Sequence, residues 1–104
     1  MFEKRAPHYS LALVRTLVRA GSVTITARVY AYLRARGWEV EYVERCLECL
    51  AQADLHKSQA HRDRPGEWLD IYRPTFEGQR LYVKFTVESR IVRVLSFCID
   101  GDEH

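Results

Sequence analysis

The hydrophobic pattern of this chain changes its period near the middle, and this change constrains the fold more than any other feature. Before that point, apolar residues such as Val40, Val43, Leu47 and Leu50 recur every three or four positions, as on one face of an α-helix. After it they recur at every second position, most clearly in the run 81–88, as on one face of a β-strand. The sequence therefore predicts an α+β chain in which helices come first and strands follow.

Start and stop signals divide the first half into three helices. Ser10 and Thr26 are residues that cap helix N-termini, and Gly21 and Gly37 are residues that end helices. The expected helices cover about residues 11–20, 27–36 and 39–52, with a short extended segment at Val23 to Ile25.

Turn signals divide the second half into strands. Pro65-Gly66, Glu77-Gly78 and Ser89-Arg90 are expected to reverse the chain. The expected strands cover about residues 54–60, 68–73, 81–88 and 91–99. We therefore expect a two-layer fold in which N-terminal helices pack on a small antiparallel sheet of three to four main strands.

The other face of this sheet is expected to be open. In the run 81–88, Tyr82 and Lys84 alternate with the apolar positions and should therefore lie on that open face. In the last strand, Leu95 and Phe97 are expected to face the core, which would place Ser96 and Cys98 beside Tyr82 and Lys84. The strands at 54–60 and 68–73 cannot be oriented in this way, because their register is not known.

The length of 104 residues suits a single domain, residues 1–104. Three acidic residues lie in the tail 100–104, which we expect to be flexible, so residues 1–99 are more basic than the net charge of +2 indicates. A basic body suits a polyanionic ligand. The chain has neither an apolar run that could span a membrane nor the pattern of a signal peptide, and we expect a cytoplasmic protein.

Cys46 and Cys49 form a C-x-x-C pair, which raises the question of a metal or redox site. Four zinc ligands would need a second pair, and neither a further C-x-x-C nor an H-x-x-x-H is present. We therefore expect buried free thiols, no metal and no cofactor. A thiol-based metal or redox protein is the weaker alternative.

Several segments together resemble the MqsR toxin family. They follow one another at compatible spacing over nearly the whole chain, and they are EKRAPH (residues 3–8), LVRAG (17–21), HKS (56–58), WLDIYRP (68–74), GQRLYVK (78–84) and VLSF (94–97). The resemblance implies a RelE-like fold and an endoribonuclease that cleaves single-stranded mRNA without a metal ion and without the ribosome. It also implies a partner antitoxin, expected to be a DNA-binding protein with a helix-turn-helix.

The resemblance also implies where the active site lies. The family's active lysine and tyrosine fall on Lys57 and Tyr82. Its glutamine and its second lysine fall on Leu69 and Cys98, which cannot supply the same hydrogen bond or charge. In such enzymes the ribose 2′-hydroxyl attacks the adjacent phosphate and leaves a 2′,3′-cyclic phosphate.

Cleavage of this kind needs a base, an acid and positive charge near the phosphate. We expect His56, which titrates near neutrality, to act as base or acid beside Lys57 and Tyr82. Lys84 and Arg73 are expected to bind phosphate, and Tyr72, which precedes Arg73, is a further candidate for contact with RNA.

Each of these residues also has an ordinary structural interpretation. Lysines on strands are usually solvated, Tyr82 can simply pack on the sheet, and Arg73 can pair with Asp70. His56 can pack or cap a strand start, and His8 can fix the N-terminal segment onto the body. The alternative function is a catalytically weakened family member that acts mainly as an antitoxin-binding or RNA-binding regulatory protein.

Overall fold

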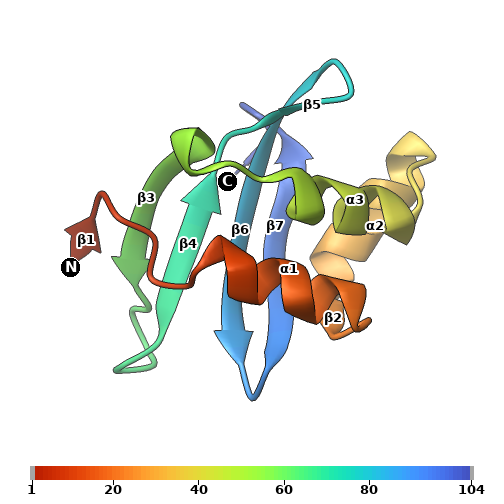
Figure 1. Cartoon of the computed structure of the whole chain (residues 1–104). Coiled ribbons are helices and arrows are strands. Elements are labelled where there is room, and N and C mark those ends of the chain that lie inside the picture. The colour runs from red at the N-terminus through yellow and green to blue at the C-terminus, as the bar shows by residue number, and fades with distance from the viewer. Residues whose placement is uncertain (1, 104) are drawn as a thin grey trace.

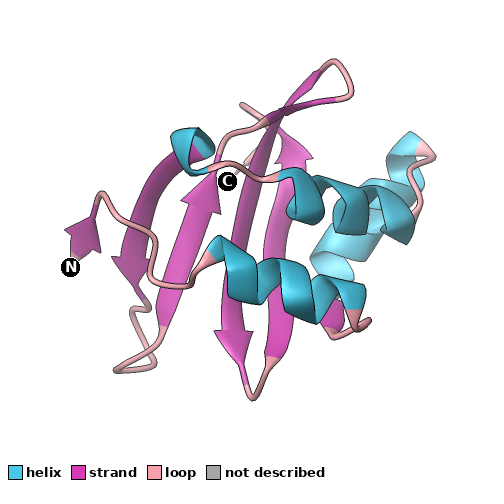
Figure 2. Ribbon diagram, viewed as in Figure 1, coloured by secondary structure: helices cyan, strands magenta, loops and turns pink. Residues whose placement is uncertain are grey.

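The computed structural model describes residues 2–103, and it contains the three predicted helices and the four predicted long strands in the predicted order (Figures 1 and 2). The helices are α1 (Leu11–Arg19), α2 (Ala27–Arg36) and α3 (Val40–Cys49), followed by a short 3-10 turn, η1 (Gln52–Asp54).

The predicted caps hold the first two helices in place. The Ser10 side chain accepts a hydrogen bond from the Leu13 amide at 3.1 Å, and Thr26 does the same for Val29 at 3.3 Å. Gly37 ends α2 with a φ of 70°, a left-handed conformation that glycine adopts without strain. The third helix ends at Cys49, earlier than predicted, because Leu50 turns into an extended conformation that buries its side chain.

The sheet has seven strands, more than the three to four that were predicted. Four strands of five to ten residues match the predicted ranges: β3 (Leu55–Ala60), β4 (Trp68–Tyr72), β6 (Gln79–Glu88) and β7 (Ile91–Ile99). Three strands of two or three residues complete it: β1 (Glu3–Lys4), β2 (Val23–Ile25) and β5 (Thr75–Phe76). Such short segments are too brief to show an alternating pattern, so only β2 was foreseen as extended.

The strand order is β1-β3-β4-β6-β7-β2, and β5 pairs separately with β6. The sheet is mixed rather than antiparallel, because β2 pairs in parallel with β7. Helices α1 and α3 cover one face of the sheet, and α2 lies beyond β7 at the β2 end (Figure 1). We call the face opposite α1 and α3 the open face.

One extra residue in β7 changes which side chains reach the core. Lys84 pairs with Ser96 while the next residue of β6, Phe85, pairs with Val94, so Leu95 has no cross-strand partner. The prediction for Phe97 is confirmed, since it lies in the core, but the prediction for Leu95 is wrong. Val94 takes that place in the core, because the bulge reverses the alternation on either side of it.

A buried carboxylate fixes the N-terminal segment to the sheet. Asp70 is 0% exposed and accepts hydrogen bonds from the amides of His8 (3.0 Å) and Tyr9 (2.9 Å) and from the Ser58 hydroxyl (2.6 Å). The His8 ring also stacks on Trp68, with 5.3 Å between ring centroids. Asp70 therefore anchors the chain just before α1, facing away from the open face.

The two cysteines of the C-x-x-C pair lie in different surroundings. Cys46 is buried as expected, but the prediction is wrong for Cys49, which is exposed. Three residues rotate a helix by about 300°, and α3 ends at Cys49, so its thiol points out of the core. Within residues 2–103, no group of three or more His, Cys, Asp or Glu side chains is arranged to hold a metal ion. None of the described helices is long and apolar enough to cross a membrane.

Candidate active site

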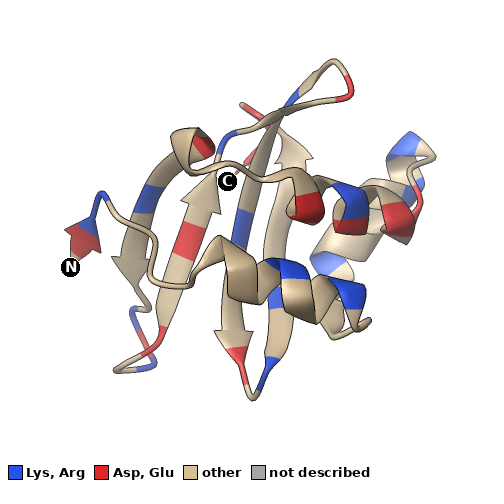
Figure 3. Cartoon of the chain, viewed as in Figure 1, with Lys and Arg blue, Asp and Glu red and all other residues tan. Residues whose placement is uncertain are grey.

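The strand register aligns two predicted lysines in one row across the open face. Lys57 of β3 pairs with Ile71 of β4, Ile71 pairs with Lys84 of β6, and Lys84 pairs with Ser96 of β7. Lys57 and Lys84 are therefore two strand spacings apart, or about 10 Å. Ile71 between them is 1% exposed, which is consistent with cover from the apolar stems of the two lysines. Figure 3 shows basic segments, in blue, on both β3 and β6.

The remaining polar candidates form a second row beside the first. Tyr82 pairs with Cys98, and the Arg73 guanidinium lies 5.8 Å from the Tyr82 ring centroid. His56 falls at the irregularity between Leu55 and Lys57 in the pairing of β3 with β4. His56 and Arg73 line the same small pocket of about 190 Å³. The fold thus brings together His56, Lys57, Arg73, Tyr82 and Lys84.

Tyr72 does not join this group. Its side chain is 0% exposed and stacks on Phe85 in the core at 5.8 Å between ring centroids. Neighbouring residues of a strand point to opposite faces, and Ile71 occupies the open face at this point. Tyr72 is therefore a core residue, and the expected contact with RNA has no support in the structure.

Arg73 has a different partner from the one the sequence suggested. Asp70 is buried on the helical side, and Arg73 instead forms an ion pair with Asp100 at 3.5 Å. Lys57 is paired as well, since its Nζ lies 2.6 Å from the Glu3 carboxylate. Both cations are held in defined positions, and both are partly exposed.

Positive charge is concentrated around Lys84. The pKa of Lys84 is lowered first by burial and then by the nearby charges of Arg28 and Lys57. Among residues 2–103, Lys84 forms no ion pair with a carboxylate. An anion bound between Lys57 and Lys84 would relieve this repulsion, so the row is suited to a phosphate.

His56 and Tyr82 have shifted pKa values that set their protonation states. Burial lowers the pKa of His56, and the charges of Arg73, Lys57 and Arg5 lower it further, so the ring is mainly neutral at pH 7 and can accept a proton. Burial and, less strongly, Glu103 raise the pKa of Tyr82, so its hydroxyl stays protonated and can donate a hydrogen bond.

Comparison with known proteins places the chain in a family. Residues 6–98 match the family described as motility quorum-sensing regulator, toxin of MqsA. The chain belongs to the MqsR toxin family. It is 32% identical to the mRNA interferase toxin MqsR of Escherichia coli (strain K12) over 85 aligned residues. The aligned region covers 82% of this chain and 87% of that protein.

Two positions of this MqsR family member depart from the residues that the resemblance leads us to expect. Leu69 lies on the open face opposite Gln59 and is 7% exposed. Cys98, also 7% exposed, has its thiol pKa raised to about 11, mainly by burial, so it is a neutral thiol rather than a cation. Neither residue can supply a charge or an amide to the rows described above.

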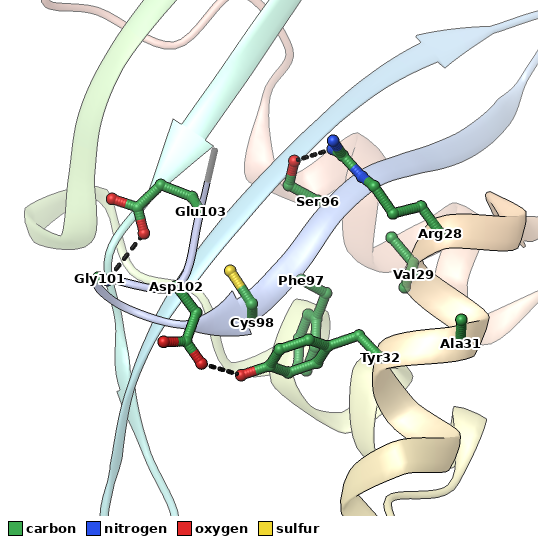
Figure 4. A pocket seen from close by; sticks show the side chains of 10 residues that line it. All are labelled: Arg28, Val29, Ala31, Tyr32, Ser96, Phe97, Cys98, Gly101, Asp102 and Glu103. Carbon is green, nitrogen blue, oxygen red and sulfur yellow. Dashed lines mark hydrogen bonds between the residues drawn. The ribbon is translucent and has the colours of Figure 1, made fainter.

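A further cation lies beside these rows and could not be foreseen from a local sequence pattern. Arg28, in the first turn of α2, donates a hydrogen bond from Nη2 to the Ser96 hydroxyl at 3.1 Å (Figure 4). Arg28 is 67 or more residues distant from its β7 partners in the sequence, so only the packing of α2 on β7 reveals it.

The acidic tail closes one side of a pocket beside the candidate site. A cavity of about 530 Å³ lies between α2, β7 and the tail, and its lining includes Arg28, Cys98, Asp102 and Glu103. Asp102 accepts a hydrogen bond from the Tyr32 hydroxyl at 2.7 Å, which ties the tail to α2 (Figure 4). Flexibility of this tail stays a prediction, but the structure gives the tail defined contacts.

Proposed function

We propose that this chain is the toxin of a type II toxin–antitoxin system and an endoribonuclease that cleaves single-stranded mRNA, with no need for a metal ion or the ribosome. The observation that carries the proposal is the cluster of His56, Lys57, Arg73, Tyr82 and Lys84 on the open face of an MqsR family member. The printed name of the Escherichia coli relative, an mRNA interferase toxin, supports the same activity. We further propose that the fold is RelE-like.

The proposed reaction forms a bond between the ribose 2′-oxygen and phosphorus and breaks the bond from phosphorus to the 5′-oxygen. Neutral His56 takes the proton of the 2′-hydroxyl. Lys57 and Arg73 stabilise the growing negative charge on the phosphate, and Tyr82 donates a hydrogen bond to it or stacks on a base. Lys84, whose pKa is lowered, gives a proton to the leaving 5′-oxygen. The products are a 2′,3′-cyclic phosphate and a 5′-hydroxyl.

The partner is proposed to be an antitoxin of the MqsA type, which the family description names. We propose that it carries a helix-turn-helix, that it binds this toxin in the cytoplasm, and that it represses their shared operon. The short edge strands β1 and β2 leave backbone groups at both ends of the sheet, where another chain can extend it.

The direct test is incubation of the purified protein with single-stranded RNA in the presence of EDTA and without ribosomes. We expect cleavage to products that end in 2′,3′-cyclic phosphate, and we expect a 2′-deoxy substitution at the cut position to block it. Induced expression should arrest growth, and co-expression of the antitoxin should relieve the arrest. Intact RNA under all these conditions would contradict the proposed activity.

The pH dependence of cleavage tests the role of His56. Because the pKa of His56 is lowered, the neutral form that can act as base should accumulate as pH rises through a value below the ordinary 6.5. We expect kcat/KM to rise with pH through that value, to level off, and to fall again at alkaline pH, where Lys84 loses the proton that it gives to the 5′-oxygen. In His56→Gln this acid limb should disappear and the rate should fall. A limb that persists unchanged in His56→Gln would assign it to another group.

A further inference from the structure

Arg28 extends the lysine row from outside the sheet. Ser96, its hydrogen-bond partner, is also the residue that pairs with Lys84 across β6 and β7. Arg28 also donates to the Leu95 carbonyl at 3.1 Å, which fixes the guanidinium at the edge of the open face. The row therefore contains Lys57, Lys84 and then Arg28, three cations on three different elements.

Arg28 makes no direct ion pair within the described part of the chain. Among residues 2–103, no ion pair joins Arg28 to a carboxylate. Asp102 and Glu103 line the same pocket, but their carboxylates accept hydrogen bonds from Tyr32 and from the Gly101 amide. Both hydrogen bonds that Arg28 donates go to uncharged oxygens, the Leu95 carbonyl and the Ser96 hydroxyl, so its guanidinium is not engaged by a carboxylate and can bind an anion such as a phosphate.

Gln59 also lies beside the lysine row, on the open face of β3. It lies two residues from Lys57 on β3, and therefore on the same face, and it pairs directly with Leu69. The side chains of such a cross-strand pair begin about 5 Å apart. The Gln59 amide thus lies beside the place where Leu69 offers only hydrocarbon.

We infer that Arg28 and Gln59 contact the RNA substrate: Arg28 binds a backbone phosphate next to the cleaved bond, and Gln59 donates its side-chain amide to the phosphate or ribose. The inference rests on the proposed function. It assigns to these two residues the charge that Cys98 cannot supply and the hydrogen bond that Leu69 cannot supply. The site is completed from α2 and β3 and not from the two altered positions.

Substitution of Arg28 tests the first half of the inference. We expect Arg28→Ala to lower kcat/KM for RNA cleavage by about tenfold, less than the loss typical of a central donor. The pocket beside Cys98 leaves room for a longer side chain, so Cys98→Lys added to Arg28→Ala should return most of the activity. Arg34→Ala, at the other end of α2, removes the same charge from an exposed position and should have no effect.

Substitution of Gln59 tests the second half by exchange. We expect Gln59→Leu to lower kcat/KM by about tenfold, the value of one lost hydrogen bond. The exchanged pair, Gln59→Leu with Leu69→Gln, keeps the composition and returns the amide from the neighbouring strand, so its activity should recover. Failure of either paired substitution to recover activity would overturn the corresponding assignment.

A binding measurement separates this inference from the proposed nuclease activity. The probe is an RNA oligonucleotide with a 2′-O-methyl group on every ribose, which cannot be cut by 2′-hydroxyl attack. The slope of log Kd against log salt should fall by about 0.7 for Arg28→Ala and stay unchanged for Arg34→Ala.

If the natural protein cuts no RNA but this slope changes, the nuclease proposal fails and the Arg28 contact stands. If the natural protein cuts RNA and Arg28→Ala behaves like Arg34→Ala, the inference is wrong. Circular dichroism checks each variant, and Arg28→Gln replaces any Arg28→Ala protein that does not fold.

Discussion

Lys57→Met is expected to lower kcat/KM for RNA cleavage by about 1000-fold, near the upper end of what removal of one donor to a developing charge costs. Lys57 lies at one end of the row that contains Lys84. Strand β3 contributes its ammonium group to that row. Methionine is an unbranched apolar side chain that can pack beside Ile71, the cross-strand partner of Lys57, so the substitution removes the charge and keeps apolar cover at this place. Induced expression of this variant should no longer arrest growth.

The control for Lys57→Met is Arg62→Ala, which removes one positive charge from the exposed loop between β3 and β4. It should cleave RNA at the natural rate. Lys57→Arg keeps the charge and should retain part of the activity. A folded Lys57→Met protein that still cuts RNA at the natural rate would remove Lys57 from the proposed mechanism.

Asp70→Asn is expected to have the largest effect on stability. The buried carboxylate accepts hydrogen bonds from three groups, the amides of His8 and Tyr9 and the hydroxyl of Ser58. An asparagine side chain keeps one acceptor and turns an NH2 group toward these donors, which leaves buried groups unsatisfied. We expect the free energy of unfolding to fall by about 3 kcal/mol and Tm by roughly 12–24 °C.

Calorimetry measures this change, and amide hydrogen exchange shows where it acts. The amides of His8 and Tyr9 should exchange faster in Asp70→Asn, because they lose their acceptor. Asp63→Asn, in the exposed loop, makes the same chemical change without burial and should leave Tm unchanged. If Asp70→Asn and Asp63→Asn had the same Tm, the anchoring role assigned to Asp70 would be wrong.

Local signals in the sequence were sufficient for the helices and the long strands. The caps at Ser10 and Thr26 and the alternating runs of β6 and β7 depend on neighbours within a few residues, and these elements lie where they were predicted. Strands β1 and β5 depend on pairing with distant segments and left no local pattern. The bulge at Leu95 was also invisible, because an extra residue shows only when β7 is aligned with β6.

The candidate site shows the same division between local and distant information. Alternation placed Tyr82 and Lys84 on one face correctly, but only the register of β3, β4 and β6 shows that Lys57 lies in the row of Lys84. Tyr72 was placed on the wrong face, although alternation indicated the correct one. It is adjacent to Arg73, and neighbouring strand positions point to opposite faces, so both residues could not face the RNA. Arg28 reaches the site through the packing of a helix, which no periodicity encodes.

The pairing of β2 with β7 has a consequence for the stage of folding at which the candidate site forms. Residues Val23 to Ile25 pair with Val92 to Val94, so strand β2, which is synthesised early, can pair only after β7 has been synthesised. Until β7 has been synthesised, the rows that contain Lys84 and Tyr82 lack their β7 side. The candidate site is therefore assembled only after β7 has paired with both β6 and β2, late in the folding of the chain.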